Sequence, residues 1–442
     1  MKEIKKINKP TSTKNWIIIW IAGMAGQLCW NVENSWFNSF VYKEIAYNPD
    51  IVTWMVGVSA IATTIATLLF GTLSDRIGKR RPFIYIGYIM WGIFTITFGT
   101  TKFISGAFIL LPTMIVLADA IMSFTGSLGN DAGFNSWTTD ITTEENRAQL
   151  GGVIAVMPVL ATLVGTIGAG AIIQIWGYFT FFVIIGIFIM AIGVFCYFTV
   201  HESPMLKPKI DTEGYWHQFW SVFNFKSFVK HKELLWVFLI MAVYFISFNV
   251  YFVHILNYII YTLGYNEANA GLILGVGLII ATLFTFPAAK FIKKGKSPEV
   301  ILGALTINFV GLFIMTLNGI AAIIIGIISA GAGYIIILQT LTAWVKNLYP
   351  DDQRAQFEGV RLIFFVCIPM IIGPMIASPI IKTWGLTMPV DEFGYVGKSP
   401  SDLLFMVSAF LSLFTLIPLM FARKYFILNK KKAEELIQTE KK

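Results

Sequence analysis

The sequence predicts an all-α membrane protein with twelve transmembrane helices in two pseudo-symmetric bundles of six. Three observations support this fold class: the composition, the number of long apolar segments and an internal repeat. Of the 442 residues, 56% are hydrophobic and only 13% are charged, whereas a soluble domain carries roughly 25% charged residues. A chain of this composition is expected to place most of its length in a lipid bilayer.

Twelve segments can span a bilayer, because a spanning helix needs about 20 mostly apolar residues. We expect them at about 16–40, 51–73, 82–100, 108–137, 149–174, 177–200, 233–262, 268–292, 299–318, 320–346, 357–382 and 402–422. A polar stretch splits them six and six. The expected domains are a first bundle (1–200), a cytoplasmic linker (201–232), a second bundle (233–422) and a basic cytoplasmic tail (423–442). In the linker, Tyr215 to Phe223 could form an amphipathic helix at the membrane interface.

An internal repeat relates the two halves. The charged turn Glu144 to Gln149 (EENRAQ) recurs 207 residues later as Asp351 to Gln356 (DDQRAQ). Two flanking pairs match at the same offset, Trp137 with Trp344 and Gly126 with Gly333. Asp131 has no counterpart, because Leu338 stands at the matching position. The pattern indicates a duplication that kept a carboxylate in the first copy only.

The net charge of +8 is explained by basic residues retained in cytoplasmic loops, not by a nucleic-acid partner. Only four lysines fall in segments expected outside: Lys43, Lys102, Lys382 and Lys398. We therefore expect a multi-pass protein of the cell (inner) membrane with both termini in the cytoplasm and no removable signal peptide. A monomer in contact with lipid is expected.

No sequence motif indicates enzymatic chemistry. The three cysteines lie in apolar segments and form no metal-like cluster: Cys29, Cys196 and Cys367. We find no Walker-type loop, no metal-ligand spacing and no nucleophile motif. An enzyme or an ATP-driven pump is therefore not expected, and no cofactor is expected beyond a coupling proton or sodium ion.

The loop after the second segment carries a recognisable signature. It reads Gly71-Thr72-Leu73-Ser74-Asp75-Arg76-Ile77-Gly78-Lys79-Arg80-Arg81-Pro82. We expect Gly71 to let a neighbouring helix approach closely, Asp75 to pair with an arginine or a helix N-terminus, and Gly78 to form a tight turn. The loop resembles the signature G-x-L-x-D-R-x-G-R/K-R/K of the major facilitator superfamily. The resemblance implies two six-helix bundles around a central cavity (the major facilitator fold) and alternating access.

The repeated turns are expected to belong to an inner gate. Arg147 and Arg354 could form ion pairs that close in one state and break in another, with acids such as Asp75 and Asp140 as partners. Solvated loop charges remain the alternative. Arg361 could line the floor of the cavity or pair with a nearby acid. The expected gate set is Gly71, Asp75, Arg76, Gly78, Arg80, Arg81, Arg147, Arg354 and Arg361.

The first apolar segment is unusually polar for a membrane span. Four amide side chains recur at helical spacing and would share one face of an α-helix: Gln27, Asn31, Asn34 and Asn38. They could bind the hydroxyls of a sugar, or they could hold helices together inside the bundle. Trp30 and Trp36 could offer flat apolar surface to a sugar ring. Glu33 lies off this face, and an acid inside a membrane span is a functional hypothesis by default.

The fourth segment carries Asp119, Asn130, Asp131 and, one turn after Asp131, Asn135. Asp131 to Trp137 (DAGFNSW), followed by Asp140 to Thr142 (DIT), looks like the fourth-helix motif of the glycoside–pentoside–hexuronide cation symporters. In that motif an aspartate precedes an aromatic residue and a serine, and an Ile-Thr dipeptide follows. The resemblance implies that Asp131 is a carboxylate shared between the coupling cation and the sugar.

The second segment departs from that family. Thr63 and Thr67 stand roughly where the family places paired acids. Sodium prefers several oxygen ligands with negative charge, whereas a proton needs only one buried carboxyl group. A proton is therefore preferred over sodium as the coupling ion.

The second half contributes further candidates. The seventh segment places polar and aromatic side chains on one face, with two amides nearby: Ser247, Tyr251, His254 and Tyr258, with Asn249 and Asn257. His254 could carry a proton, although a lone histidine among aromatics is more often a packed, hydrogen-bonded residue. In the tenth segment Gln339 offers one polar contact.

These features predict a secondary active transporter that imports a sugar or glycoside with a cation. The alternatives are a proton-coupled antiporter that exports drugs or other organic solutes, and a lipid-handling or receptor protein on the same scaffold. The polar first segment argues against the drug exporter.

Overall fold

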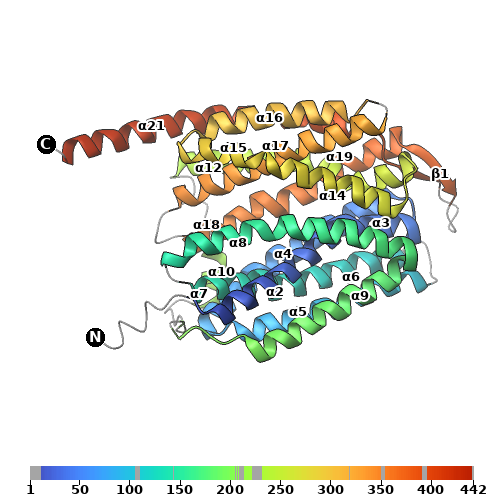
Figure 1. Ribbon diagram of the computed structural model, residues 1–442, viewed down its shortest axis with the longest axis horizontal. Coiled ribbons are helices and arrows are strands. Elements are labelled where there is room, and N and C mark those ends of the chain that lie inside the picture. The colour runs from blue at the N-terminus through green and yellow to red at the C-terminus, as the bar shows by residue number, and fades with distance from the viewer. Residues whose placement is uncertain are drawn as a thin grey trace. The chain divides into compact units, whose positions relative to one another are not determined.

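The computed structural model describes residues 11–104, 110–142, 144–204, 206, 208, 214–221, 231–317, 319–349, 354–390 and 396–440. By their contacts the residues group into two units. The first consists of Met1–Phe219, Val253–Val276 and Ile381–Ser401, and the second of Trp220–Phe252, Gly277–Ile380 and Asp402–Lys442. Each unit is built from long helices that run side by side (Figure 1).

The first unit contains most of the N-terminal half. Its helices and π-helical segments are α2 (Thr13–Val32), η1 (Glu33–Phe37), α3 (Asn38–Phe40), η2 (Val41–Ile45), α4 (Pro49–Ile77), α5 (Arg81–Thr100), the short 3₁₀ turn η3 (Thr101–Phe103), α6 (Leu110–Ser127), η4 (Leu128–Phe134), α7 (Asn135–Asp140), α8 (Glu144–Thr162), η5 (Leu163–Gly168) and α9 (Ala169–Thr199). Two pieces from later in the chain join it: α13 (Ile255–Asn257) with η6 (Tyr258–Thr262), and the antiparallel strands β1 (Leu386–Val390) and β2 (Val396–Ser399).

The second unit contains most of the C-terminal half. Its elements are α12 (Lys232–Phe252), α15 (Thr285–Lys293), α16 (Ser297–Ile314), α17 (Ile320–Leu348), α18 (Arg354–Leu362), η7 (Ile363–Cys367), α19 (Ile368–Trp384, which ends in the first unit), α20 (Leu403–Leu413) and α21 (Leu416–Glu440). Besides α19, two helices have residues in both units, α10 (Tyr215–Ser221) and α14 (Glu267–Leu283). Tyr215 of the linker helix α10 donates its hydroxyl to the Leu69 carbonyl of α4 over 2.9 Å.

Local sequence explains where several helices begin and end. Asn48 caps α4 by accepting from the backbone of Asp50, and Pro49 follows at the first helical position. Gly78 ends α4 with a φ of 68° in the left-handed region, where glycine is at no disadvantage. A φ of 78° at Gly177 interrupts the long helix α9.

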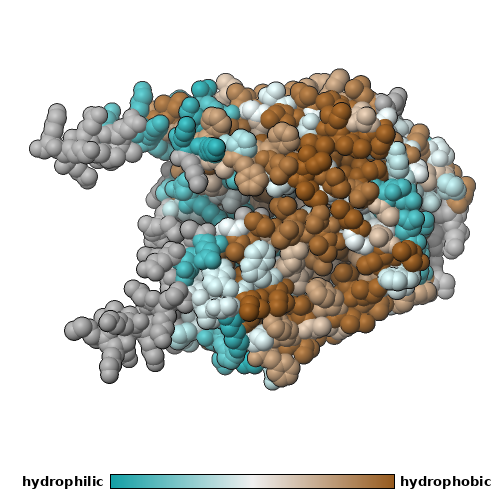
Figure 2. Space-filling model, viewed as in Figure 1, coloured by the Kyte–Doolittle hydropathy of each residue, from teal (hydrophilic) through white to brown (hydrophobic). Residues whose placement is uncertain are grey.

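The twelve-helix prediction agrees with the described residues. Ten of their helical stretches are long and apolar enough to cross a membrane, and one of these, Gln149–Thr199, contains two expected spans joined at Gly177. The first expected span runs from Thr13 to Ile45 as an interrupted helix. Its polar residues lower its mean hydropathy. On the face shown in Figure 2, apolar side chains cover the middle of the helices and polar ones gather toward their ends.

The internal duplication extends to packing. A Cβ atom added at Gly126 in α6 would meet the ring of Trp91 in α5 at 2.7 Å. A Cβ atom added at Gly333 in α17 would meet Asn308 in α16 at 2.6 Å. In each half, therefore, the matched glycine allows close contact with the helix that precedes it.

The contact units depart from the boundaries read from the sequence. The seventh expected span breaks at Val253 and His254, between α12 and α13. The part after the break packs with the first helix, since Asn257 donates to the Asn38 carbonyl over 3.2 Å. Segment Val253–Val276 therefore groups with the N-terminal helices.

Candidate functional site

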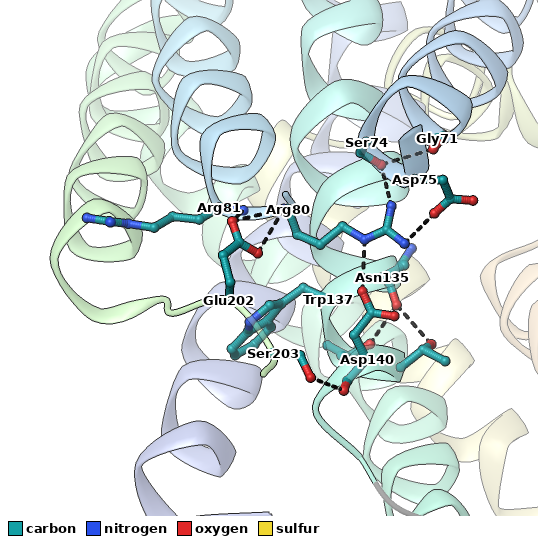
Figure 3. Close-up of polar contacts among 12 residues, drawn as sticks. Gly71, Ser74, Asp75, Arg80, Arg81, Asn135, Trp137, Asp140, Glu202 and Ser203 are labelled. Atoms are coloured by element: carbon teal, nitrogen blue, oxygen red, sulfur yellow. Dashed lines mark hydrogen bonds and ion pairs between the residues drawn. The ribbon is translucent and has the colours of Figure 1, made fainter. Parts of the chain in front are cut away.

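Arg80 is the centre of a polar cluster at the end of α4 (Figure 3). Its side chain is 6% exposed, and its Nε donates to Asp140 Oδ2 over 2.8 Å. Its two terminal nitrogens donate to Asp75 and to the hydroxyl of Ser74. Burial alone lowers the pKa of Arg80, but its bond to Asp140 and its pairing with Asp75 leave the pKa raised. The guanidinium thus remains charged and joins α4, α5 and α7.

Glu202 and Ser203 extend this cluster. The Glu202 carboxylate accepts from the backbone N–H groups of Arg80, at 2.9 and 3.0 Å, and Arg81, at 2.9 Å. It therefore supplies negative charge at the N-terminus of α5, where the first backbone N–H groups have no hydrogen-bond partner within the helix. Ser203 donates to the Asp140 carbonyl over 2.7 Å. Trp137 Nε1 donates to the carbonyl of His201, the residue before Glu202, over 2.8 Å.

The expectations for the loop glycines had different outcomes. The tight turn at Gly78 is confirmed by its positive φ, and a Cβ atom there would also meet Pro208 at 2.7 Å. The expected close approach at Gly71 is wrong, because a Cβ atom there would meet nothing within 4 Å. The reason is that Gly71 faces open space in this arrangement, and its carbonyl accepts from Ser74.

Among the described residues, Arg80 contacts two of the acids expected at the inner gate. Asp75 and Asp140, which we expected to pair with Arg147, bind Arg80. The side chains of Arg147 and Arg354 lie outside the described residues. The Nη1 atom of Arg76 is buried and has no hydrogen-bond partner among the described residues. Arg361 lies over the ring of Phe365 at 5.4 Å.

Asp131 lies in the π-helical segment η4 and is partly exposed. Its Oδ1 accepts from the amide of Asn130 over 2.9 Å and from the amide of Asn135 over 3.5 Å. Asn130 is buried, and its own oxygen accepts from the Tyr88 hydroxyl over 3.2 Å. The structure therefore brings the three candidates of the fourth segment together, and the neighbouring amides orient the carboxylate.

The four amides of the first helix do not share one environment. Asn31 bonds two hydroxyls on the fifth span, donating to Thr162 over 3.2 Å and accepting from Thr166 over 3.1 Å. Asn34 donates to the Trp30 carbonyl of its own helix over 2.7 Å. Asn38 is buried and bonds to its own helix as well as to Asn257. Gln27 is partly exposed.

The single-face stripe is therefore wrong. The reason is that η1 interrupts the α-helix between Asn31 and Asn38, and the wider π turns rotate everything that follows. Trp36 is also not a surface for a sugar, because it is fully buried against Gly170 and Gly271. Trp30 packs against Trp91, with ring centroids 4.8 Å apart.

Glu33 is buried inside the helices of the first unit, with 9% of its surface exposed. Its Oε1 accepts from Ser123 Oγ over 2.6 Å and from Ser59 Oγ over 3.2 Å. The sequence left its depth open, and the structure places it between α4 and α6. Its other oxygen has no hydrogen-bond partner among the described residues.

A second polar cluster lies around α3, at the end of the first unit away from α7 (Figure 1). Ser39 bonds the Tyr178 hydroxyl over 2.7 Å, and Lys43 pairs with Glu267 at 3.4 Å. His254 is fully buried beside Tyr42, with ring centroids 6.4 Å apart. Neither ring nitrogen of His254 has a hydrogen-bond partner among the described residues. This histidine is therefore packed, as the alternative expected, but the expected hydrogen bond is missing among the described residues.

The candidates in the second unit are mostly packing residues. Asn249 bonds the Phe245 carbonyl of its own helix over 2.8 Å and lies against Gly373. Tyr251 is buried against Phe248 and Phe405. Gln339, by contrast, is exposed.

The matched tryptophans have different partners. Trp344 Nε1 donates to the Glu233 carboxylate over 2.8 Å, in place of the backbone carbonyl that Trp137 binds. Asn429 Nδ2 donates to the other oxygen of Glu233 over 2.5 Å. A cavity of about 340 Å³ adjoins this carboxylate. The duplicated halves have thus diverged at their polar contacts.

Sequence reasoning did not single out Ser59, Ser123, Glu202 or Glu233. Each is polar within or next to an apolar segment, and that is the only signal the sequence offers. Among the described residues, no group of three or more His, Cys, Asp or Glu side chains is placed to hold a metal ion.

Comparisons with known proteins agree with the fold. The family model described as Major Facilitator Superfamily matches residues 19–374, and again residues 237–441. In a comparison with curated proteins, none matches the chain by sequence.

Several solved structures are similar. A mutant of the nucleoside transporter NupG has a TM-score of 0.71 at 12% identity, covering 92% of this chain and 99% of that one. A D-xylose-proton symporter scores 0.67 at 16%, covering 91% and 97%. A bacterial homolog of the human lysosomal transporter Spinster, inward-facing and occupied, scores 0.67 at 15%, covering 96% and 98%. Identities this low establish a shared fold only.

Proposed function

The chain belongs to the Major Facilitator Superfamily and is a multi-pass membrane transporter, not an enzyme, and we propose that it imports a sugar or glycoside together with a cation. The coupling ion we propose is a proton, and sodium is the second choice. We place the protein in the cell (inner) membrane with both termini in the cytoplasm, because basic residues concentrate in the segments that would lie inside. The fourth-helix motif supports kinship with the glycoside–pentoside–hexuronide cation symporters.

The observation that carries this proposal is the environment of Asp131. Its carboxylate is partly exposed within the fourth span and is held by the amides of Asn130 and Asn135. A carboxylate flanked by amides can accept from the hydroxyls of a sugar while a cation balances its charge.

In the proposed cycle Asp131 contacts the solute and the cation, and Glu33 is a second proton site. Binding a proton removes the cost of a buried charge and allows the loaded carrier to close. The loop from Gly71 to Arg81, with Arg147 and Arg354, would form the inner gate. The contacts of Lys43 with Glu267 and of Asn38 with Asn257 would break when the opposite end opens.

The substrate class is tested first by ligand stabilisation. Purified protein is heated with a panel of mono- and disaccharides, nucleosides and lipophilic cations, with and without sodium, at two pH values. Because a ligand stabilises the state that binds it, a substrate raises the unfolding temperature. A shift with sugars alone supports the proposal. A shift with nucleosides or lipophilic cations and none with sugars would overturn the substrate class.

Coupling is tested by uptake into proteoliposomes. A proton gradient should drive accumulation of the stabilising sugar by the wild-type protein, and Asp131→Asn should lose this accumulation. Asn135→Ala, which removes only the longer of the two amide contacts, should retain it with a higher KM. Unchanged coupling in Asp131→Asn would remove Asp131 from the mechanism.

A further inference from the structure

Two acidic side chains meet in the interior of the first unit, where η1, α4 and α6 come together. Glu33 is 9% exposed and Asp119 is 2% exposed. Ser123 and Ser59 both bond Glu33 Oε1, at 2.6 and 3.2 Å. Ser123 also donates to the Asp119 carbonyl over 2.9 Å, and Ser59 interacts with the Asp119 carboxyl group. Two serines therefore link two carboxyl groups that lie 86 positions apart in the chain into one network.

The network contains more contacts than its serines can supply with protons. The two hydroxyl oxygens lie 2.6 Å apart, and Ser123 Oγ also lies 2.9 Å from the Asp119 carbonyl oxygen. With the two bonds to Glu33, four oxygen–oxygen contacts are present. Each hydroxyl donates one proton, so two of the four have a serine donor. Protons on the carboxyl groups are the remaining source of donors within the network.

Each carboxyl group also has an oxygen without a partner. Glu33 Oε2 and Asp119 Oδ1 are buried, and neither makes a hydrogen bond with any described residue. The ion pairs of the described residues engage other acids, such as Asp140 with Arg80 and Glu267 with Lys43. An ionised carboxylate buried without a cationic partner is costly, and taking up a proton removes that cost.

The distances favour a proton over a metal cation. Oxygen atoms that surround a metal ion repel one another, because no proton lies between them. The two separations of 2.6 Å, between Ser59 and Ser123 and between Ser123 and Glu33, are those of hydrogen-bonded oxygen pairs. A sodium ion at this position would have to push these atoms apart.

We propose that Glu33 and Asp119 form one proton-binding site, in which their carboxyl groups share protons with Ser59 and Ser123. The pair is the second proton site of the proposed cycle, and Asp131 contacts the solute and the cation. This inference rests on the proposed function. Loading adds a proton to one carboxylate oxygen and neutralises its charge, and release returns that proton to water. No covalent bond other than O–H forms or breaks.

The other titratable groups near the site are few. The charge of Asp131 acts on Glu33, and the thiol of Cys29, on the same helix, faces Glu33 as well. Neither belongs to the hydrogen-bonded network of the two serines. Both are acids, so each adds negative charge when ionised and neither neutralises the pair.

The test uses a carbodiimide, dicyclohexylcarbodiimide, which adds to protonated carboxyl groups in apolar surroundings. Full-length protein in detergent is treated across a series of pH values, without any solute, and the modified residues are identified by peptide mass spectrometry. We expect modification at Glu33, Asp119 or both, and a decrease as the pH rises. Modification of neither residue, or modification that does not depend on pH, would overturn the site.

Variants show whether the two acids act as a pair. In Asp119→Asn the midpoint of Glu33 modification should move to lower pH by about 1 unit or more, because strongly interacting sites titrate together. Glu33→Gln should do the same for Asp119. Asp131→Asn should cause a smaller shift of the Glu33 midpoint. Equal midpoints in the wild type and in Asp119→Asn would show that the acids are independent and would overturn the shared site.

Serine variants supply the matched control. Ser123→Ala removes a donor to the ionised Glu33, so the midpoint of Glu33 modification should rise. Ser127 lies one turn further along α6, is fully buried and has no hydrogen-bond partner among the described residues. Ser127→Ala should therefore leave the profile unchanged. A shift of the same size in both variants would indicate a general loosening of the bundle and would overturn the assigned role of Ser123.

Two further outcomes distinguish a proton site from a sodium site, and a failure of the acidic pair from a failure of the proposed substrate class. Protection from modification by sodium chloride, compared with choline chloride at the same pH, would identify a sodium site and overturn the proton assignment. Because the labelling needs no solute, its result is independent of sugar uptake. Normal labelling in a protein that moves no sugar would refute the substrate class and keep the site, whereas proton-driven sugar uptake without labelling would refute the site alone.

Discussion

Arg80 Nε lies 2.8 Å from Asp140 Oδ2, which ties the start of the third span to the end of the fourth. We expect Arg80→Ala to lower the free energy of unfolding by about 3 kcal/mol, near the lower limit for buried ion pairs, because Asp140 and Asp75 remain partly exposed. Arg80→Lys should recover only part of this, since an ammonium group cannot bind both acids in a fixed fork. Denaturant titration in detergent measures the change.

Arg81→Ala is the control for this prediction. Among the described residues, the Arg81 guanidinium bonds the Tyr197 carbonyl and lies over the Tyr197 ring at 5.0 Å, at the exposed edge of the helices, so its loss should cost less than about 1 kcal/mol. Similar losses for Arg80→Ala and Arg81→Ala would contradict the central place of Arg80 in the cluster.

The two loop glycines should respond to alanine with opposite signs. Gly78→Ala should cost about 1–2 kcal/mol, because a non-glycine residue is strained at a φ of 68°, and its Cβ atom would also meet Pro208. Gly71→Ala should stabilise the protein by about 0.5 kcal/mol, because the site is open and alanine favours the helix. Thermal unfolding of both variants checks the signs. Destabilisation by Gly71→Ala would contradict the open environment. Loss of uptake by a stable Gly71→Ala protein would show that another state needs the close approach.

The local features of the fold could be predicted from the sequence, and the features that depend on packing could not. The Gly78 turn follows from the loop itself, because the conformation is decided by that residue and its neighbours. The surroundings of Gly71 depend on which helix lies opposite, and no pattern within the loop contains that information. The spans and the duplication could be predicted because they involve the periodicity and spacing of many residues.

The site was predicted as residue types but not as an arrangement. Asp131 with Asn130 and Asn135 came together as expected, because the three lie within about one turn of one helix. Glu33 was recognised as unusual, but its partners Ser59 and Ser123 lie 26 and 90 residues away. The π-helical segment η1 also shifts the helical register, and no residue type in the segment marks such a shift.

Asn31 is expected to stabilise the bundle, not to bind solute. Asn31→Ala loses two bonds to Thr162 and Thr166 on the fifth span, so we expect a loss of about 1 kcal/mol, given that interhelical bonds in membranes average about 0.6 kcal/mol each. Asn34→Ala is the matched control, because the hydrogen bond that its amide makes among the described residues is to its own helix, and its stability should be almost unchanged. Denaturant titration distinguishes the two. If instead Asn31→Ala kept full stability but lost the sugar-induced rise in unfolding temperature, Asn31 would be a solute ligand.

Replacing His254 by leucine should make the protein more stable. The imidazole is fully buried and neither nitrogen has a hydrogen-bond partner among the described residues, and an unsatisfied buried polar group costs about 1–3 kcal/mol. Leucine has a similar size and lacks this cost, so His254→Leu should raise the free energy of unfolding by about 1 kcal/mol, the lower end of that range. His254→Gln keeps a polar group in the same place and should give no gain. Thermal unfolding of the two variants in parallel provides the comparison. A loss of stability in His254→Leu would mean that a buried water or a changed packing satisfies the ring. A stable His254→Leu protein that no longer couples uptake to protons would give this histidine the proton role that its surroundings argue against.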